Sequence, residues 1–405
     1  MNSKSLSITF LIATITSGLV LVSIVPFSTV QASTSVSGLI SSDTTWTLTG
    51  SPYIITGDIL VDNNVLLNIK SGVVVKFDGG TNLIVDGTLV AEGDETRPIT
   101  FTSNAASPAS NDWGTINFRG SSTGSILKWV SVSYASDGVT VTSGSPTFEH
   151  CSITDNQRYG IYVSAGAPKI ISSTISSNGK DGIWNYVGII TISDSTISNN
   201  KGNGIYKDSK SITIHNSIIS NNLQSGIYGG AGGEFTVSNC TVSYNGLDGI
   251  TVCYSDLIIT NSEITYNNRD GVRMESGTLS GTAKITGNKI SYNSGNGVYK
   301  SSGSIQLRNN TITFNQVGIV ATPFKLVSSN SFQEKSGDTL IEYNNIVNNT
   351  SYAIENVGPG TNIFGAVLNL TATNNWWGTT DTALIDQLIR DIRDDFSLGR
   401  VEYQH

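Results

Sequence analysis

Four aromatic residues recur about 22 positions apart, each two residues after a glycine: Tyr162, Trp184, Tyr206 and Tyr228. If the chain winds so that equivalent positions stack about 4.8 Å apart, their rings form a flat outward platform about 14 Å long. Such a platform suits the apolar faces of successive sugar rings. The spacing therefore indicates a carbohydrate-binding column. The alternative is ordinary cross-strand stacking that only stabilises the sheet.

Acidic residues supply the second candidate chemistry. Asp248 and Asp270 stand just before the glycine in neighbouring copies of the same pattern, so we expect them on adjacent coils. Like charges at that separation raise the pKa of one carboxyl, and such a pair can cleave glycosides or bind Ca²⁺. Arg269 and Arg273 can instead neutralise the pair, and Asp is common at turns for backbone reasons. Asp248 and Asp270 are thus the candidate catalytic residues, with no Ca²⁺ site assigned.

Soft metal ligands are too scattered to predict a metal site. The three histidines do not share a repeat position, and Met274 is the one methionine after the first 32 residues. Cys151 and Cys240 share a position but are expected four coils apart, about 19 Å, which is beyond the reach of a disulfide. We predict no metal, no cofactor and buried, free cysteines.

The pattern that carries these residues is an internal repeat. Its copies pair an Asn with a Gly four residues later, as in Asn156 with Gly160 and Asn222 with Gly226, at a period of about 22 residues. A unit of that size cannot enclose a core alone, so neighbouring units must share one. The repeat therefore predicts a stack of similar coils.

Apolar residues occupy three positions of every copy, typified by Ile170, Ile175 and Ile183. Alternation with polar residues favours strands over helices. Three inward positions in each turn predict three short strands separated by corners, which is an all-β, single-stranded parallel β-helix. Right-handed winding is expected because parallel crossovers almost always take that hand.

Corner residues have predictable structural roles. The repeat Asn can bond to its own backbone and to the Asn of the next coil, forming a ladder along the axis. The repeat Gly can adopt the positive φ that a bend requires. A second aromatic set stands just before the corner Asn, and its predicted role is to fill the core; its members are Tyr244, Tyr266, Tyr292 and Phe314.

The two ends of the mature chain are less regular. Strand-like runs at 61–69, 73–77, 83–90 and 99–102 predict opening coils, and residues 105–111 predict a loop that leaves the stack. From Asp381 to Phe396 the apolar residues fall at helical spacing, with Thr380 or Asp381 available as N-cap. This pattern predicts an amphipathic helix that caps the last coil, sealed by Trp376 and Trp377; the alternative is a helix that binds a partner.

The first residues indicate export. Lys4, the apolar stretch 6–25 and a small-residue site ending at Ala32 are typical of a secretory signal, although an uncleaved anchor is the alternative. The predicted segments are 1–32 (signal peptide), 33–143 (irregular opening coils), 144–373 (regular repeats) and 374–405 (tryptophan-containing segment and capping helix). No integral membrane span is expected in the mature chain. The predicted location is the cell surface or the medium.

Composition argues against one class of partner. The net charge is −8, from 31 acidic against 23 basic residues, and only 13% of the 405 residues are charged. A nucleic-acid groove needs clustered Lys and Arg to neutralise phosphates. We therefore expect no nucleic-acid partner.

The chain resembles the secreted right-handed parallel β-helix proteins of archaea and bacteria, the pectin lyase-like and NosD-like group. The coil pattern over residues 144–356 carries the resemblance, and segments 51–57, 72–77, 86–93 and 99–103 look like that family's opening coils. Residues 374–378, with the acidic helix that follows, look like the end motif of archaeal surface members. The resemblance implies the fold. It does not choose among lyases, glycosidases, epimerases, adhesins and surface proteins. Lyase sites of the superfamily combine clustered basic residues with acidic Ca²⁺ ligands, and no such set is matched here.

Three functions fit these observations. The leading hypothesis is an exported protein without catalysis that binds a polysaccharide, a cell-surface glycan or another cell-envelope component through its aromatic column. The second is a polysaccharide lyase or glycoside hydrolase that uses Asp248 and Asp270. The third is a structural component of a surface layer, which would self-associate without affinity for glycans.

Overall fold

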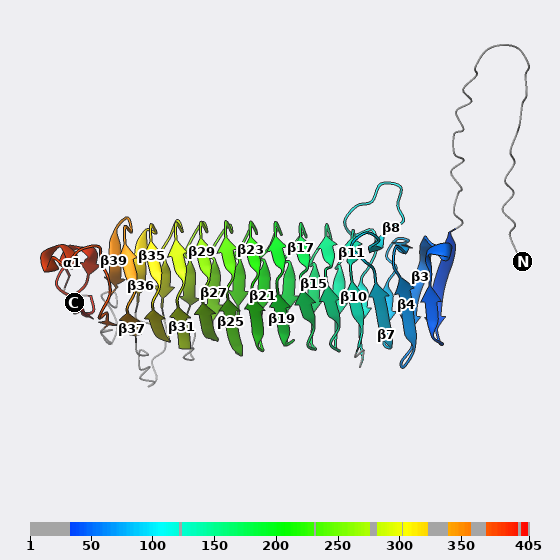
Figure 1. Cartoon of the computed structure of the whole chain (residues 1–405), viewed down its shortest axis with the longest axis horizontal. Coiled ribbons are helices and arrows are strands. Elements are labelled where there is room, and N and C mark those ends of the chain that lie inside the picture. Colours follow the sequence, from blue (N-terminus) through cyan, green and yellow to red (C-terminus); the bar gives the residue numbers. More distant parts are fainter. Residues whose placement is uncertain are drawn as a thin grey trace, which may run out of the picture. The chain divides into compact units, whose positions relative to one another are not determined.

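Alternating apolar and polar residues make each coil a set of three short strands. The computed structural model has about 13 coils of about 22 residues, and equivalent strands of successive coils pair in parallel. It describes residues 33–120, 124–230, 232–275, 282–301, 303–322, 339–357, 370–395 and 398–403; the expected signal segment 1–32 lies outside them. In Figure 1 the coils follow one another from β1, in blue, to the red carboxy-terminal segment. The predicted parallel β-helix is confirmed.

The strands form three stacks, one for each side of the coil. Stack 1 is a 15-stranded sheet, and the other 27 strands form stacks 2 and 3, with β1 and β3 running through both. Stack 1 comprises β2 (Thr44–Trp46), β4 (Leu66–Lys70), β7 (Thr88–Glu92), β10 (Ile126–Lys128), β13 (Thr147–Glu149), β16 (Lys169–Ile171), β19 (Ile190–Ser193), β22 (Ile212–His215), β25 (Glu234–Ser238), β28 (Asp256–Thr260), β31 (Thr282–Thr286), β34 (Ser304–Arg308), β37 (Thr339–Glu342), β40 (Leu370–Thr371) and β42 (Val401–Glu402).

Stack 2 comprises β1 (Thr34–Ile40), β3 (Tyr53–Val61), β5 (Val74–Phe77), β8 (Ile99–Ser103), β11 (Val130–Ser133), β14 (Ser152–Thr154), β17 (Thr174–Ser176), β20 (Thr196–Ser198), β23 (Ile218–Ser220), β26 (Thr241–Ser243), β29 (Glu263–Thr265), β32 (Lys289–Ser291), β35 (Thr311–Thr313) and β38 (Asn345–Val347). After the second halves of β1 and β3, stack 3 continues with β6 (Leu83–Val85), β9 (Ile116–Phe118), β12 (Val139–Val141), β15 (Ile161–Val163), β18 (Ile183–Asn185), β21 (Ile205–Lys207), β24 (Ile227–Gly229), β27 (Ile250–Cys253), β30 (Val272–Glu275), β33 (Val298–Lys300), β36 (Val317–Ala321), β39 (Tyr352–Asn356) and β41 (Ile389–Arg390). A 3-10 turn, η1 (Leu48–Gly50), lies between β2 and β3.

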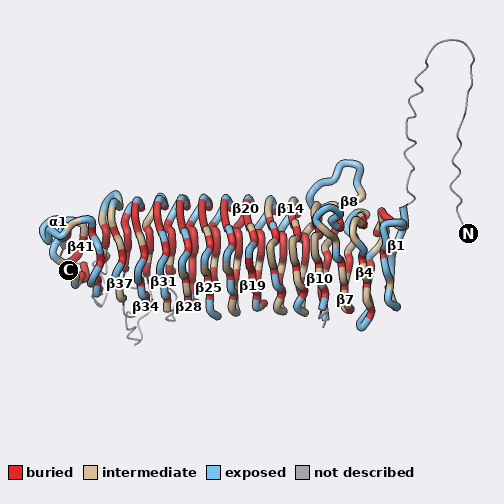
Figure 2. Tube along the Cα trace, viewed as in Figure 1, coloured by how far each residue is buried: buried red, intermediate tan, exposed pale blue. Residues whose placement is uncertain are grey.

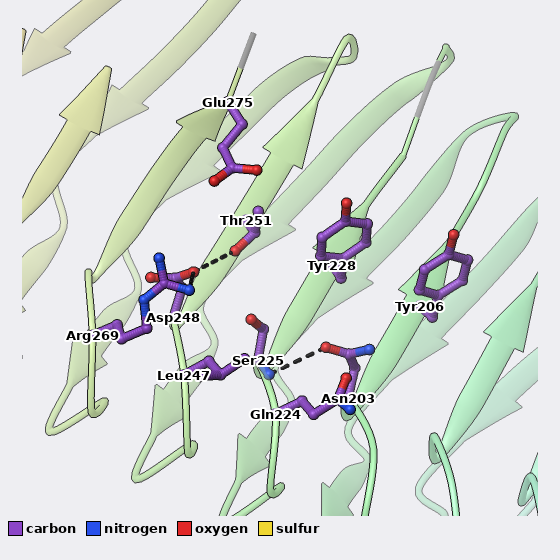
Figure 3. Close-up of a pocket in the computed structure, with 10 residues that line it drawn as sticks. All are labelled: Asn203, Tyr206, Gln224, Ser225, Tyr228, Leu247, Asp248, Thr251, Arg269 and Glu275. Carbon is purple, nitrogen blue, oxygen red and sulfur yellow. Dashed lines mark hydrogen bonds and ion pairs between the residues drawn. The ribbon is translucent and has the colours of Figure 1, made fainter. Parts of the chain in front are cut away.

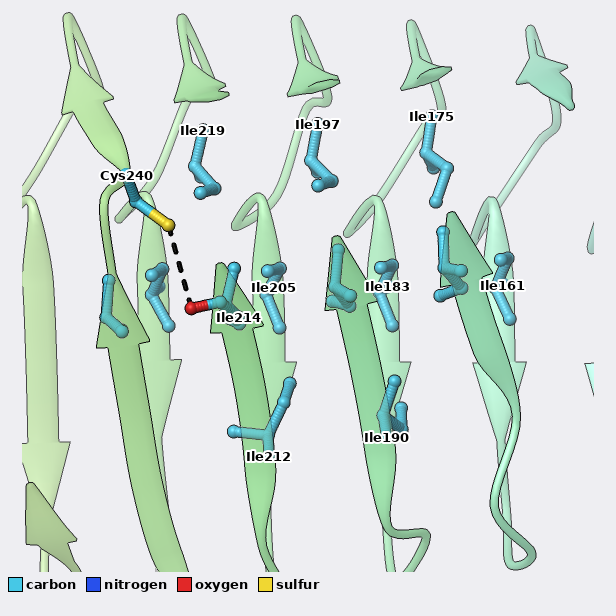
Figure 4. Packing of buried hydrophobic residues seen from close by; sticks show 14 of the residues in the cluster. Ile161, Ile175, Ile183, Ile190, Ile197, Ile205, Ile212, Ile214, Ile219 and Cys240 are labelled. Carbon is cyan, nitrogen blue, oxygen red and sulfur yellow. Dashed lines mark hydrogen bonds between the residues drawn. The ribbon is translucent and has the colours of Figure 1, made fainter. Parts of the chain in front are cut away.

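The three predicted inward positions form the core. Ile170, Ile175 and Ile183 are completely buried, and their equivalents in the regular repeats are at most 1% exposed. Figure 4 shows such isoleucines meeting between the stacks, and the buried positions recur along the tube in Figure 2. Each buried isoleucine contributes about 1.5–3 kcal/mol by leaving water, so the core of one coil depends on the next coil for its cover.

The corner between stacks 2 and 3 contains the predicted Asn ladder. The Nδ2 of Asn178 donates to Asn200 Oδ1 at 2.9 Å, and the Nδ2 of Asn200 donates to Asn222 Oδ1 at 2.9 Å. Each Oδ1 also accepts from the backbone N–H of the preceding ladder residue, at 3.1 Å in both cases. The ladder therefore satisfies amide groups that the corner buries.

The repeat glycines have a different role from the predicted one. None of the copies has positive φ; the left-handed residue is the one just before the Asn, such as Asn221 with φ of 56°. A Cβ on Gly226 would lie 2.7 Å from Asn245 Nδ2 and 2.8 Å from the carbonyl oxygen of Gly249. Glycine is therefore required because adjacent coils approach closely, so the predicted bend with positive φ is wrong.

The opening coils contain more turns than the sequence predicted. The expected run 61–69 is broken between β3 and β4, and the run 83–90 is broken between β6 and β7, whereas β5 and β8 match their runs closely. Residues 105–111 are exposed and form the predicted loop, seen beyond β8 in Figures 1 and 2. The Ser110 hydroxyl donates to the Asp155 carbonyl at 2.7 Å, which ties the loop to a later coil.

The carboxy-terminal helix is present but short. Helix α1 spans Thr382–Leu388, and the Asp381 carboxylate caps it by accepting from Ala383 N at 2.9 Å. The predicted continuation is wrong up to residue 395, because β41 leaves the helical path and pairs with β39; Phe396 lies outside the described residues. Trp377 is buried, as expected for a seal, whereas Trp376 is 51% exposed, contrary to expectation.

Candidate functional site

The predicted aromatic column stands on stack 3. Register between β15, β18, β21 and β24 places Tyr162, Trp184, Tyr206 and Tyr228 side by side, all half-buried. The Tyr206 and Tyr228 rings are parallel, with centroids 5.3 Å apart and planes at 4°. The Trp184 indole is edge-on to both neighbours, at 87° to Tyr162 and 80° to Tyr206.

The four rings therefore do not form one flat platform. Tyr159, a buried residue from the preceding corner, packs against Trp184 with centroids 4.6 Å apart and planes at 71°. Trp184 thus has partners on three sides, and edge-to-face geometry is one of the two arrangements that aromatic pairs favour. Only Tyr206 and Tyr228 keep the parallel arrangement that the platform requires.

A groove opens where the column is interrupted. Thr251 follows Tyr228 in register and Arg273 follows Thr251, so a small side chain stands where the earlier coils have an aromatic ring. The resulting hollow has a volume of about 280 Å³, and Figure 3 shows Tyr206, Tyr228 and Asp248 around it. It brings together the aromatic column and one predicted acid, which the sequence treated as separate sites.

Asp248 is almost fully buried in the wall of this groove. Its Oδ2 accepts from the Thr251 hydroxyl at 2.9 Å and lies 3.5 Å from Arg269 Nη1, while its Oδ1 accepts from the backbone N–H of Asp270 at 3.0 Å. Burial raises the pKa of Asp248, although these hydrogen bonds and the nearby Arg269 charge act against the rise. Its carboxylate therefore serves the corner as well as facing the groove.

Asp270 lies on the next coil, as predicted, but does not line the groove. Its Oδ1 accepts from Asn296 N at 2.7 Å and from Asn296 Nδ2 at 2.9 Å, and its Oδ2 pairs with Arg273 Nη1 at 2.7 Å. All of these bonds belong to the corner and its neighbours. The structure thus brings Asp248 and Asp270 together through a backbone hydrogen bond, without opening both carboxylates to one space.

Glu275 is a groove residue that sequence reasoning missed. It stands two residues after Arg273, hence on the same face of β30, and Arg273 Nε pairs with Glu275 Oε1 at 2.6 Å. Burial acts to lower the pKa of Arg273, but its hydrogen bonds to Glu275 and Asp270 outweigh that effect and raise it. The outward alternation of β30 was the signal that could have identified Glu275.

The Tyr228 hydroxyl contacts a thiol of the next coil. The hydroxyl lies 3.6 Å from Cys253 Sγ, and this contact together with burial raises the pKa of Tyr228. The phenol therefore stays protonated around neutral pH and can donate to a ligand. All three cysteines are buried and free. No group of three His, Cys, Asp or Glu that could hold a metal ion occurs among the residues that the structure describes.

The second aromatic set is exposed, so its predicted role in the core is wrong. Alternation from Val242 predicts Tyr244 to point inward, but a φ of 57° at the corner turns the side chain outward and Asn245 takes the buried place. Successive rings of this set, which we call the tyrosine ladder, are parallel within 2–5°, with centroids 4.7–5.0 Å apart. The tyrosine ladder consists of Tyr244, Tyr266, Tyr292 and Phe314.

Fold and register define a class of protein, the parallel β-helix. A family model described as a right-handed β-helix region matches residues 184–332, and one described as a pectate-lyase-like β-helix domain matches residues 38–138. The chain belongs to the right-handed β-helix proteins of the pectin lyase-like superfamily. No curated protein is a significant sequence match.

Several solved structures are similar to this chain. One is the A-module of the Azotobacter vinelandii mannuronan C-5 epimerase AlgE4, with 16% identity, 87% of this chain and 88% of that chain covered, and a TM-score of 0.44. Another is the AlgE6 A-module from the same organism, with 15% identity, coverages of 81% and 88%, and a TM-score of 0.43. A third is the periplasmic alginate epimerase AlgG, with 14% identity, coverages of 87% and 78%, and a TM-score of 0.33.

Proposed function

We propose that this chain is an exported protein that binds a polysaccharide along stack 3, at the cell surface or outside the cell. Export through residues 1–32, and the division into opening coils 33–143, regular repeats 144–373 and closing segment 374–405, are parts of this proposal. Within the described residues, no helix is both long and apolar enough to cross a bilayer. The ligand is a free polysaccharide or a glycan of the cell envelope.

One observation carries the proposal: the parallel Tyr206 and Tyr228 rings end at a groove with polar and charged walls. Sugars present apolar C–H faces to aromatic surfaces and hydroxyls to hydrogen-bonding groups. A site that combines an aromatic surface with hydrogen-bonding groups can therefore recognise a sugar. The groove supplies the Arg269 guanidinium, the Glu275 carboxylate and the Gln224 amide beside the rings.

Retention on polysaccharide affinity gels tests the proposal. The double variant Tyr206→Ala with Tyr228→Ala should lose most of the retention that the wild-type mature protein shows, because it removes both rings beside the groove. Tyr299→Ala is the matched control: it removes a tyrosine of the same column whose ring is covered by Arg273, with 4.2 Å from the guanidinium carbon to the ring centroid. Equal retention of wild type and double variant would exclude the column as a binding site.

A second candidate function is cleavage of a polysaccharide, favoured by the raised pKa of the buried Asp248 beside Arg269 and Glu275. A raised pKa brings a carboxyl closer to the range in which it can act as a general acid. Release of reducing ends or of unsaturated products from a polysaccharide panel, with and without Ca²⁺, measures this activity. Asp248→Asn keeps an acceptor for Asp270 N, so its loss of such activity would assign the acid. No product from any substrate would leave binding as the function.

A further inference from the structure

We infer that the amino-terminal end of the tyrosine ladder is a second carbohydrate subsite, in which a pyranose ring stacks on the free face of Tyr244. The inference rests on the proposed glycan ligand and adds a contact on the other side of the corner loops from Tyr206 and Tyr228. This subsite lies at the corner that follows stack 2.

The tyrosine ladder stops abruptly at Tyr244. Residues 199, 221 and 244 are successive left-handed positions along the same corner, with φ of 57°, 56° and 57°. The first two are asparagines, so the short Asn221 stands where the next ring would be. Tyr244 is accordingly 57% exposed, compared with 44% for Tyr266 and 42% for Tyr292, whose rings are covered on both sides.

A hollow of about 420 Å³ lies against Tyr244 on this side. Its other walls include Asn199, Asn221, Lys201 and Leu223, and Leu223 is 67% exposed. One aromatic wall, one apolar edge and a floor of amides match a pyranose, which has C–H faces and a rim of hydroxyls. An apolar peptide segment would leave these amides unpaired.

The floor amides are positioned and partly unused. The Nδ2 of Asn199 donates to Ser198 Oγ and that of Asn221 to Ser220 Oγ, both at 3.2 Å, which fixes the planes of the two amides. Within the described chain neither Oδ1 receives a hydrogen bond, so both remain acceptors for sugar hydroxyls. Among the residues that the structure describes, none forms an ion pair with Lys201. An uncompensated ammonium at the rim favours a pyranose that carries a carboxylate.

The backbone of the tyrosine ladder is in an unfavourable conformation, because all four of its residues have positive φ. Bulky residues rarely adopt positive φ, and this corner places four of them in succession there, although Asp, Ser or Asn occupies the position in the four preceding coils. Residues in unfavourable backbone conformations concentrate at functional sites. The change from Asn221 in one coil to Tyr244 in the next creates both the free ring face and the hollow beside it.

The test uses two matched variants of the mature protein and titration calorimetry with galacturonate and glucose hexasaccharides. Asn221→Tyr continues the tyrosine ladder by one ring, fills the hollow and keeps the left-handed backbone, so it should abolish the contribution of this subsite. Phe314→Ala removes the ring at the opposite end and costs one stacking contact, as Tyr244→Ala does. Thermal unfolding of each variant verifies that it folds.

Loss of the sugar–ring contact should weaken hexasaccharide binding about fivefold in Asn221→Tyr and in Tyr244→Ala, with Phe314→Ala within about twofold of wild type. The galacturonate form should bind more tightly than the glucose form, and Lys201→Met should remove that preference. Wild-type affinity in Asn221→Tyr, alongside lost binding in the Tyr206→Ala with Tyr228→Ala variant, would overturn this subsite but leave the proposed function. No binding of either hexasaccharide to the wild type would overturn this subsite, and no retention of the wild type on any polysaccharide gel would refute the proposed function as well.

Discussion

Removing one rung of the Asn ladder should destabilise the stack far more than a typical polar substitution. Asn222 Oδ1 accepts from Asn200 N at 3.1 Å and from Asn200 Nδ2 at 2.9 Å, and Asn222 Nδ2 donates to Ile197 O at 3.2 Å and to Asn245 Oδ1 at 3.1 Å. All of these atoms are buried in the corner, where water cannot replace the lost side chain.

The magnitude follows from the groups left without a partner. Asn222→Ala leaves the backbone N–H of Asn200 and one side-chain amide proton of Asn200 without an acceptor. It also removes the donor that Asn222 Nδ2 supplies to Ile197 O. A buried polar group that loses its partner costs about 1–3 kcal/mol, so the free energy of unfolding should fall by about 3–5 kcal/mol. Because stability in a stack of repeats depends on neighbouring interfaces, the loss should also reduce the cooperativity of unfolding.

Urea unfolding followed by circular dichroism measures the effect. Gln224→Ala, an exposed change in the same corner loop, is the control and should stay within about 0.5 kcal/mol of wild type. If Asn222→Ala lost no more stability than Gln224→Ala, the hydrogen-bonded ladder would not be what holds this corner together.

Two further predictions concern the interior. Gly226→Ala should cost about 1–3 kcal/mol of stability, because its Cβ would meet the next coil at 2.7–2.8 Å; thermal unfolding measures this, and a neutral result would contradict the close-approach role of the repeat glycine. Lys207 and Lys300 face the core, and burial lowers the pKa of each to about 8. Above that pH the unfolded chain binds more protons than the folded chain, so the free energy of unfolding should rise as the pH increases from about 8 towards the pKa of lysine in the unfolded chain. Plots of the free energy of unfolding against pH for the wild type and for the double variant Lys207→Met with Lys300→Met should therefore diverge in this range. Parallel plots would refute the lowered pKa of the two lysines.

Repetition made the core and the coil period predictable from the sequence. A position that is apolar in every copy, such as that of Ile183, has one explanation in a stack of strands, which is to face inward. The Asn ladder followed from the same regularity. Local backbone conformation was not predictable: a positive φ at Tyr244 reverses the direction that alternation assigns, and nothing in the letter Tyr indicates such a conformation.

Competition between neighbours also limited the prediction of the site. Tyr159 turns Trp184 edge-on, so the expected flat column reduces to Tyr206 and Tyr228. At the carboxy end, pairing of Ile389 with Ile354 ends the helix after Leu388 although the apolar spacing continues. Both differences arise from contacts between residues far apart in sequence, which a period cannot encode.

Filling the groove on stack 3 tests the proposed function most directly. Thr251→Tyr would place a third ring after Tyr206 and Tyr228 and close the hollow of about 280 Å³. Calorimetric titration with the oligosaccharide that the wild-type protein retains best should give saturable heat for the wild type and none for Thr251→Tyr, with both proteins folded. Equal affinities for the two proteins would contradict a binding site in this groove.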